Sequence, residues 1–203
     1  MPKEKKIISK IIEKKKKKED ELYTAAYELF TTKGANNTAI DEIVKKAGVA
    51  KGTFYLYFKD KYDIINKLIL KKSSQVVKEA MIKTEEQGIE SFEDRTIFFI
   101  DYVINYFKEN RLMLKLINKN LSAGLFKRAL RNPDENREVE EVVNFFIENL
   151  IKRGMEEIEA ELTLFMIFEL AGSVCYSSIV LGEPEEIDVI KPVLFNKILA
   201  MIG

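Results

Sequence analysis

Residues 38–61, TAIDEIVKKAGVAKGTFYLYFKDK, restrict the possible folds of this chain more than any other stretch. Thr38 and Asp41 form a capping-box pattern, in which both side chains accept hydrogen bonds from the first turn of a helix. Gly48 predicts the end of that helix, because glycine readily takes the left-handed backbone conformation found there. Between these ends, apolar residues recur at the spacing of one helix face: Ile40, Ile43, Val44 and Ala47.

A second short helix is predicted over residues 50–58. Its first turn holds Lys51, Gly52 and Thr53, and no acidic residue follows until Asp60. A helix whose N-terminal face is small and rich in hydrogen-bond donors suits the major groove, because bulk there would hold the helix away from the bases. The two helices and the glycine turn therefore predict a helix-turn-helix, with the recognition helix at about residues 50–58.

This stretch resembles the DNA-binding domain of the tetracycline-repressor (TetR/AcrR) family of bacterial regulators. The resemblance covers residues 20–70 and departs from the family at Ala50, where a serine or threonine usually caps the recognition helix. The positions that carry it are Ala25, Ala26, Leu29, Phe30, Gly34, Gly48, Val49, Lys51, Gly52, Tyr55, Tyr57, Phe58 and Lys61.

The resemblance implies an all-α fold. An N-terminal three-helix helix-turn-helix DNA-binding domain would precede a larger C-terminal helical domain for ligand binding and dimerisation. We expect a lysine-rich arm over residues 1–18, the DNA-binding domain over 19–66, and the ligand-binding and dimerisation domain over 67–203.

The family pattern also implies the DNA contacts. The start of the recognition helix would bind a phosphate, because its free amides and the helix dipole attract anions. Thr53 and Tyr55 would face the groove, whereas Phe54 and Phe58 are predicted to be core residues. The full set of expected DNA-binding residues is Thr38, Lys51, Gly52, Thr53, Tyr55, Tyr57 and Lys61.

The charge distribution is uneven along the chain. Residues 1–72 hold 18 lysines, no arginine and 10 acidic residues, a net charge of +8, and residues 73–203 carry the opposite net charge of −8. This asymmetry indicates an N-terminal part that binds a polyanion and a C-terminal part with another task.

Residues 2–18 contain nine lysines and two acidic residues. Three interpretations are open: a solvated tail, an arm that binds DNA phosphates or the minor groove, and a basic helix on an anionic membrane. The nearby helix-turn-helix favours DNA.

Cap residues and helical spacing predict the other helices. Asp60, the pair Ser91 and Asp94, and the pair Asn132 and Pro133 are expected to begin helices, and an irregular segment is expected from Gly124 to Asn132. The predicted helices cover residues 19–33, 61–86, 92–108, 112–121, 133–153, 158–181 and 185–202.

Residues 162–181 contain a single charge, Glu169. Their length is enough for a membrane span, but a helix that meets the core on one side and a partner subunit on the other is equally apolar. We expect this second arrangement, with a homodimer formed through the last two helices and no membrane.

The sequence holds no catalytic pattern. It has no histidine, the commonest general base and metal ligand, and no glycine-rich phosphate loop. Its one cysteine, Cys175, lies in an apolar run, which excludes a disulfide framework and fits a reducing cytoplasm. We expect no enzyme activity, no metal, no cofactor and no secretory signal.

The resemblance implies a pocket for a small-molecule effector among the C-terminal helices. Asp101 and Glu169 are carboxylates within apolar runs, and we expect one of them to meet a cationic or hydrogen-bonding group of a lipophilic effector, or else to form a salt bridge. The candidate lining residues are Phe98, Phe99, Asp101, Tyr102, Met113, Leu116, Phe146, Phe165, Met166, Phe168, Glu169 and Tyr176.

Together these features predict a DNA-binding transcriptional regulator, which by family resemblance is a repressor. It would bind a palindromic double-stranded DNA operator as a homodimer and leave it when an effector binds. The alternatives are a helical lipid- or membrane-surface-binding protein and a ligand-carrying protein with a vestigial DNA-binding domain.

Overall fold

The computed structural model describes the backbone of residues 2–120 and 133–203, and the side chains of residues 9–117 and 139–203. No described residue lies in a strand, so the predicted all-α fold is confirmed. The chain divides into two compact units, Met1–Ile69 (unit 1) and Leu70–Gly203 (unit 2), whereas we expected the division after residue 66. The irregular segment expected from Gly124 to Asn132 lies outside the described residues.

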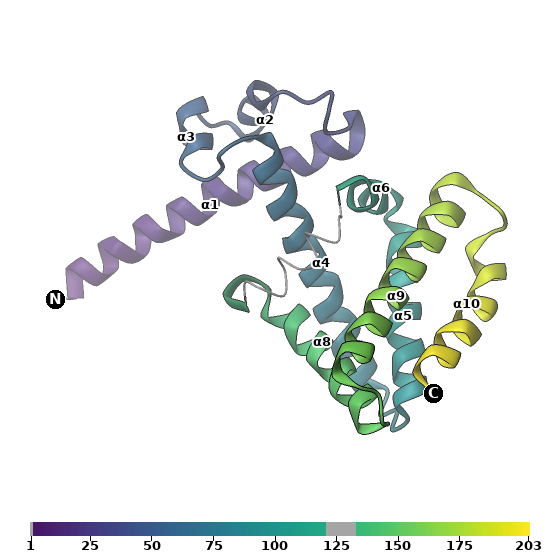
Figure 1. Ribbon diagram of the computed structural model, residues 1–203. Coiled ribbons are helices and arrows are strands. Elements are labelled where there is room, and N and C mark those ends of the chain that lie inside the picture. Colours follow the sequence, from purple (N-terminus) through teal and green to yellow (C-terminus); the bar gives the residue numbers. More distant parts are fainter. Residues whose placement is uncertain (1, 121–132) are drawn as a thin grey trace. The chain divides into compact units, whose positions relative to one another are not determined.

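Unit 1 begins with one uninterrupted helix, α1 (Pro2–Lys33), which is visible in Figure 1. The expected boundary between an arm and a first helix at residue 19 is therefore not a helix boundary. Lysine and glutamate are good helix formers, and no glycine or proline interrupts residues 3–33, so the helix continues through the lysine-rich segment. It ends at Gly34, whose φ of 82° is left-handed and whose amide donates to the Phe30 carbonyl at 3.1 Å.

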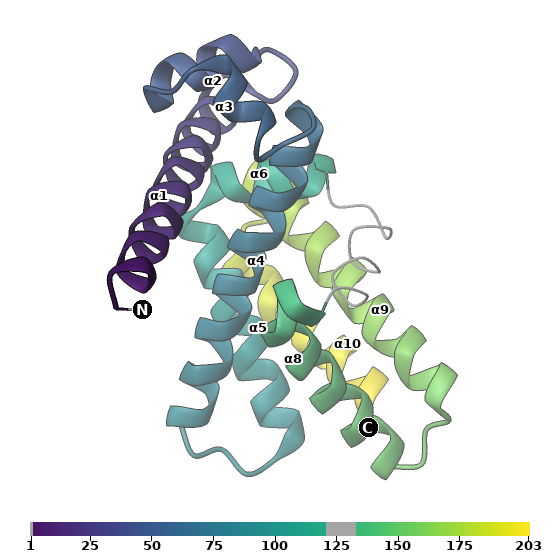
Figure 2. The same ribbon diagram turned by 90° about the vertical axis from the view of Figure 1, so that its left-hand side faces the viewer.

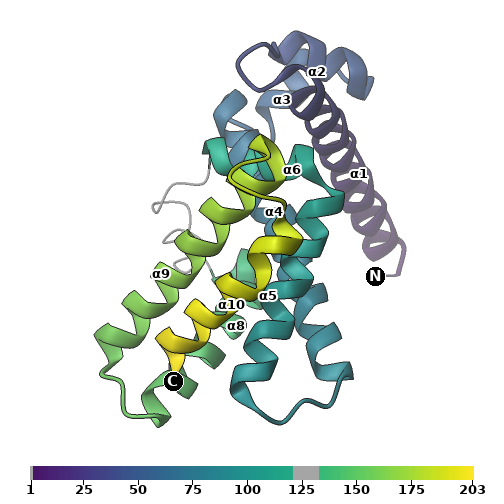
Figure 3. The same cartoon turned by 90° about the vertical axis from the view of Figure 1, so that its right-hand side faces the viewer.

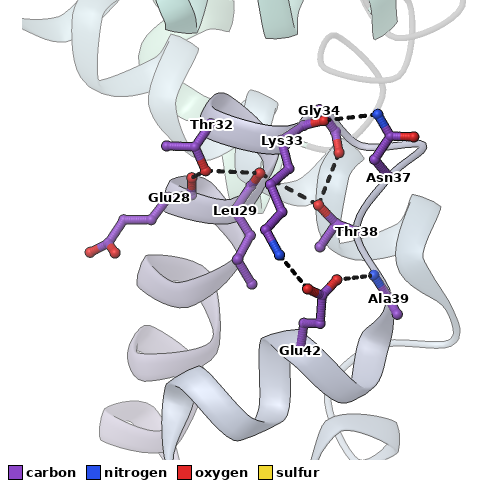
Figure 4. Close-up of polar contacts among 9 residues, drawn as sticks. All are labelled: Glu28, Leu29, Thr32, Lys33, Gly34, Asn37, Thr38, Ala39 and Glu42. Atoms are coloured by element: carbon purple, nitrogen blue, oxygen red, sulfur yellow. Dashed lines mark hydrogen bonds and ion pairs between the residues drawn. The ribbon is translucent and has the colours of Figure 1, made fainter.

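Helix α2 (Ile40–Ala47) begins one residue later than a cap at Thr38 requires. The Thr38 hydroxyl donates instead to the Gly34 carbonyl at 2.9 Å, and the Glu42 carboxylate accepts the Ala39 amide at 3.0 Å (Figure 4). The predicted cap formed by Thr38 and Asp41 is therefore wrong. The Thr38 side chain is buried against the end of α1, which leaves Ala39 at the cap position and places Glu42 on the third residue of the helix.

The second helix of the motif is shorter than predicted. Helix α3 covers Lys51–Tyr55, and a helical turn continues it, with the Phe58 amide donating to the Phe54 carbonyl at 3.0 Å. The turn before it forms as predicted: Gly48 has a φ of 67°, and the Val49 amide donates to the Val44 carbonyl at 3.0 Å.

The core of unit 1 holds α3 in place through two phenylalanines. Phe54 and Phe58 are buried as predicted, and their ring centroids lie 5.4 Å apart. Tyr23 of α1 contacts Phe58 edge to face at 5.1 Å. Burying each phenylalanine stabilises this packing by roughly 1.5–3 kcal/mol. The other buried apolar residues of the unit are Leu22, Ala25, Ala26, Phe30, Ile43, Val44, Ile64, Ile65, Leu68 and Ile69.

Helix α4 (Lys61–Glu86) has the predicted bounds. Asp60 caps it, because its Oδ1 accepts hydrogen bonds from the amides of Tyr62 at 2.7 Å and Asp63 at 2.9 Å. The helix continues without a break past Ile69, so its first part belongs to unit 1 and the remainder to unit 2.

Unit 2 contains the remaining helices (Figure 2). The predicted cap at Ser91 is confirmed, since its hydroxyl accepts the Asp94 amide at 3.2 Å. The long apolar helix differs from the prediction, because its last six residues form a π-helix. The elements are α5 (Phe92–Glu109), α6 (Arg111–Asn120), α8 (Pro133–Lys152), α9 (Glu157–Cys175), the π-helix η1 (Tyr176–Leu181) and α10 (Ile187–Ile202).

Aromatic contacts join α5 to α8 in the core of unit 2. Phe146 lies 5.6 Å from Phe92 and 6.0 Å from Phe99, measured between ring centroids, and both contacts are edge to face. Helices α9 and α10 pack side by side on one outer face of the unit (Figure 3).

Candidate nucleic-acid interface and ligand cavity

The outer face of α3 gathers four of the residues predicted to bind DNA. Lys51, Gly52 and Tyr55 are exposed and Thr53 is half-buried, whereas Phe54 points into the core. The Tyr55 side chain is 53% exposed, which is a large exposed fraction for an aromatic residue in a packed unit. The face is therefore accessible to a macromolecular partner.

Lys51 already has an ion partner in this structure. Its Nζ lies 2.8 Å from Oδ1 of Asp41 in α2, and the hydrogen bond to this carboxylate raises the pKa of Lys51. Both side chains are more than half exposed, so the pair contributes little to stability. A DNA phosphate at the start of α3 would compete with Asp41 for the same ammonium group.

Two other predicted DNA contacts have different surroundings. Lys61 donates to the Asn36 carbonyl at 3.4 Å and lies 5.8 Å from the centre of the Tyr62 ring. Thr38 is only 2% exposed, and its hydroxyl donates to backbone carbonyls. Its side chain therefore has no surface to offer a phosphate, and we leave Thr38 out of the interface proposed below.

We expected Tyr57 to reach DNA, but its hydroxyl forms a hydrogen bond within the protein. The hydroxyl donates to the Lys15 carbonyl of α1 at 3.1 Å, and the Tyr57 carbonyl accepts from Lys67 Nζ at 3.2 Å. Both bonds fix the turn that follows α3.

Leu56 is a surface residue that sequence reasoning missed. It is 80% exposed at the end of α3, between two tyrosines. An exposed apolar side chain beside a recognition helix is suited to contact the methyl group of thymine. Its exposure could have been predicted from the sequence, because Leu56 does not lie on the helix face that the core residues Phe54 and Phe58 share.

Unit 2 contains a cavity of about 450 Å³, within the range of small-molecule sites. Its wall is formed by side chains from α4, α5, α6, α8 and α9 and is predominantly apolar. The apolar residues that line it include Leu70, Val76, Val77, Phe99, Ile100, Val103, Ile104, Phe107, Leu114, Ile117, Val139, Val142, Val143, Phe146, Leu164, Ile167 and Phe168.

Few of the predicted lining residues reach this cavity. Phe99, Phe146, Phe168 and Glu169 line it. The cavity wall does not include Phe98, Asp101, Tyr102, Met113, Leu116, Phe165, Met166 or Tyr176. Met113 and Leu116 are instead buried in the packing of α6.

Helical register explains the errors on α5. The cavity side of this helix carries Phe99, Ile100, Val103, Ile104 and Phe107, which recur three and four residues apart. The prediction chose aromatic residues, and Phe98 and Tyr102 project from a different face.

Tyr102 has a polar partner instead of a cavity position. Its hydroxyl is hydrogen-bonded to Glu79 of α4, and this bond raises the pKa of Tyr102 to about 12.

Asp101 belongs to a polar cluster between α5 and α10. Lys191 Nζ lies 2.8 Å from Asp101 Oδ1 and donates to Asn105 Oδ1 at 2.6 Å. The Asn105 side-chain amide donates to Asp101 at 2.9 Å. The expected role of Asp101 in the pocket is therefore not supported. The salt-bridge alternative holds for Asp101, with Lys191 as its partner.

Glu169 is the single charged residue among the described residues that line the cavity. It is exposed, so its carboxylate is in contact with solvent and not desolvated as the sequence suggested. Exposed Ser173 and half-buried Ser73 and Ser74 also line the cavity. Cys175 contributes a buried thiol, and burial raises its pKa to about 11. The cavity thus combines a large apolar wall with a few hydroxyls and one carboxylate.

In the part of the chain that the structure describes, no three His, Cys, Asp or Glu side chains are grouped so that they could hold a metal ion.

These two units define a helix-turn-helix transcriptional regulator with a helical ligand-binding part. Residues 22–68 match the family model described as bacterial regulatory proteins, tetR family. The HTH-type transcriptional regulator YdgC of Bacillus subtilis, itself uncharacterized, is 31% identical over 169 residues, which cover 81% of this chain and 83% of YdgC. The chain belongs to the tetR family of bacterial regulators. It is a transcriptional regulator and not an enzyme, as predicted.

Two further relatives extend the comparison. The fatty acid metabolism regulator protein of Bacillus subtilis is 38% identical over 66 residues, or 32% of this chain and 34% of that protein. The crystal structure of the transcriptional regulator FadR from Bacillus subtilis in complex with stearoyl-CoA matches with a TM-score of 0.65 at 18% identity, over 90% of this chain and 98% of that one. At this identity the structural match shows a shared fold.

Proposed function

We propose that this protein is a cytoplasmic repressor that binds a palindromic operator as a homodimer and is released by a small lipophilic effector. One observation carries the proposal. A single chain combines an exposed, donor-rich α3 with an apolar cavity, and the uninterrupted helix α4 contributes residues to the unit that holds α3 and to the cavity wall.

The outer face of α9 and α10 supports a homodimer. Contiguous exposed apolar residues on a protein surface mark an interaction site. Among the described residues, one helical segment, Glu157–Leu181, is long and apolar enough to span a membrane, and only 22% of its most apolar window is buried. A second copy of the same helices would cover this surface. Its exposed residues are Ile158, Leu162 and Met166 of α9 and Val189 and Val193 of α10.

A two-fold symmetric dimer fits a palindromic operator. It would present two copies of α3 to successive major grooves about 34–36 Å apart, or to a multiple of that distance. Tyr55, Thr53 and Leu56 would face the base edges, and Lys51 and Lys61 would neutralise phosphates.

The cavity wall supports an effector with a long hydrocarbon portion. The described wall is formed mainly by aliphatic and phenyl groups, which favour burial of alkyl chains. The FadR structure that shares this fold contains stearoyl-CoA, and a relative that matches over 66 residues is a fatty acid metabolism regulator. We therefore propose a fatty acyl compound or a similar long-chain amphiphile.

The polar end of the effector would meet Glu169 and Ser173. Both residues are exposed and both line the cavity. We propose that the Glu169 carboxylate accepts a hydrogen bond from the effector or pairs with a cationic group on it. A Glu169→Gln variant that binds each effector and leaves DNA as the native protein does would disprove this role.

Release would follow from a population shift. The effector stabilises the conformation whose cavity accommodates it, and it can shift the equilibrium only by its difference in affinity between the two conformations. Leu70, Val76 and Val77 of α4 line the cavity, so a change there moves the helix that begins at Lys61 in unit 1.

Operator binding is tested by fluorescence anisotropy with duplexes from the region upstream of the gene. We expect saturable binding of two protomers per site and a loss of at least about tenfold in Tyr55→Ala, because α3 then loses its largest groove-facing side chain. Tyr62→Ala is the matched control, since Tyr62 is 61% exposed but lies on α4. Weak binding that is equal on all duplexes and unchanged in Tyr55→Ala would disprove the proposal.

Effector action is tested on the same DNA complex. Long-chain acyl-CoA, free fatty acids and alkylammonium compounds are titrated, and release is compared between the native protein and Val103→Phe. We expect Val103→Phe to keep operator affinity and lose release, because its ring occupies the cavity. Ile82→Phe is the control, since Ile82 is exposed and lies outside the cavity wall. Equal release in all three proteins would place the effector elsewhere.

A further inference from the structure

The family match begins at residue 22, yet α1 begins twenty residues earlier. Residues 10–18 of α1, KIIEKKKKK, form a helical segment that we call the lysine extension. All nine residues are exposed, and six of them are lysines. The DNA-binding role proposed for α3 does not account for this segment.

The lysine extension is fixed beside the recognition element of unit 1. The Tyr57 hydroxyl donates to the Lys15 carbonyl at 3.1 Å, which joins residues 42 positions apart in the chain. Tyr57 lies two residues after the end of α3, so the bond places the middle of the extension next to the turn that follows the recognition helix. The lysine extension and α3 belong to the same compact unit.

The lysines present positive charge in every direction around the helix. Lys14–Lys18 are five consecutive residues, and successive residues of an α-helix are rotated by about 100°, so their side chains surround the axis. Lys16 and Lys17 line a surface hollow together with Glu13, Asp20 and Glu21, which partly neutralise them. Lys10, Lys14 and Lys18 recur every four residues, form a row outside this hollow, and have no ion pair in the described part of the chain.

Such a segment requires a polyanion rather than a protein partner of mixed charge. Like charges at neighbouring positions on a helix destabilise it, and phosphates that bind the lysines remove this repulsion. A membrane-surface helix needs one wide apolar face. Here the described apolar residues are Ile11 and Ile12, and Lys15, one turn later on the same side of the helix, ends the apolar face.

We propose that the lysine extension is a second DNA contact, which binds backbone phosphates beside the base pairs that α3 contacts. The inference rests on the operator binding proposed above. Because phosphate contacts carry no base identity, the extension raises affinity for any duplex and leaves the preference for the operator to α3. Tyr57 acts as a positioning residue that holds the extension next to α3.

The salt dependence of binding to a long duplex tests the proposal. In the triple variant Lys10→Gln, Lys14→Gln, Lys18→Gln, the slope of log K against log salt becomes shallower by about 0.9 for each phosphate that the variant no longer neutralises. The ratio of operator to non-operator affinity stays the same. The matched control is Lys115→Gln, Lys152→Gln, Lys197→Gln, which removes three exposed lysines from unit 2 and keeps the native slope. Glutamine preserves helix propensity in both variants.

Three outcomes would overturn the inference. In the first, the triple variant keeps the native slope. In the second, the control variant shows as large a decrease in slope as the triple variant. In the third, the triple variant loses binding to phosphatidylserine vesicles and still binds DNA as the native protein does. In each case Tyr55→Ala still weakens operator binding, so the proposed function survives. If the native protein binds no operator, both proposals fail.

Tyr57→Phe tests the positioning role separately. It removes only the hydroxyl, so α3 keeps its ring packing. We expect faster amide hydrogen exchange over residues 10–18 and a shallower salt slope, with the preference for the operator retained. Unchanged exchange over these residues would show that Tyr57 does not hold the extension.

Discussion

Asp41 of α2 and Lys51 of α3 are joined by an ion pair across the helix-turn-helix, with 2.8 Å between Oδ1 and Nζ. The pair lies at the start of the proposed recognition helix. It places a carboxylate where a DNA phosphate would approach, so the two anions compete for one ammonium group. The free protein therefore holds Lys51 in place but lowers the positive potential of the interface.

Replacing Asp41 with asparagine should tighten DNA binding. The substitution removes a negative charge beside the DNA and leaves Lys51 available, and we expect the affinity to rise roughly two- to fivefold at low salt. Fluorescence anisotropy on operator and random duplexes measures the change. Glu90→Gln removes an exposed carboxylate of unit 2 and should have no effect. Weaker binding in Asp41→Asn would mean that the pair organises α3 for DNA.

Glu93 and Arg153 should make stability depend on pH in acid. Two guanidinium nitrogens of Arg153 contact the two carboxylate oxygens of Glu93, which lowers the pKa of Glu93 to about 2. A lowered pKa in the folded state stabilises the protein above the unfolded pKa, about 4.5, and this stabilisation is lost as pH falls from 4.5 to 2.

The test compares urea unfolding of the native protein and Glu93→Gln at pH 7, 4.5 and 2.5. Native protein should be more stable at pH 7, and the difference should shrink between pH 4.5 and 2.5. Glu90→Gln should show no such change. A difference between native protein and Glu93→Gln that is constant across pH would contradict the role of the ion pair.

Cys175 should report on the cavity. Its thiol is buried, lines the cavity and has a pKa raised to about 11, so little thiolate is present at neutral pH. We expect maleimide to label the folded protein far more slowly than the urea-unfolded protein, and an effector in the cavity to slow labelling further. Because the chain has one cysteine, mass spectrometry measures this rate directly. Equal rates in folded and unfolded protein would exclude a buried thiol.

The outer face of α9 and α10 should control the oligomeric state. Leu162→Lys combined with Val193→Lys places two charges on a surface that we propose a second copy covers, and charges in such an interface are strongly unfavourable. We expect the dimer dissociation constant to rise by at least about tenfold, measured by sedimentation equilibrium. Leu112→Lys, at an exposed position of α6, is the control. A double variant that remains dimeric would place the interface elsewhere.

Local sequence patterns predicted the helices well. Gly48, Asp60 and Ser91 act as helix-end residues where the sequence places them, because each effect depends on groups within four residues. The family resemblance over residues 20–70 was also correct, since it depends on a contiguous motif. The predicted cap at Thr38 was wrong because of a tertiary contact. The Thr38 hydroxyl donates to carbonyls at the end of α1, and no local sequence pattern contains that contact.

The residues that line the cavity could not be predicted from the sequence. Phe98, Tyr102 and Tyr176 were as plausible as Phe99, because composition does not reveal which helix face turns inward. The partner of Asp101 could not be read from local patterns either, because Lys191 lies ninety residues later in the chain and the fold places its Nζ 2.8 Å from Asp101 Oδ1.

The sequence by itself determined the class of protein, the helix-turn-helix and the uneven distribution of charge, because these follow from short-range spacing and from the residues present. Only the tertiary structure decided which side chains line the cavity, which carboxylates are paired, and that the lysine extension lies against Tyr57. Those properties depend on packing between segments distant in the chain, where small differences in helix rotation decide which atoms meet.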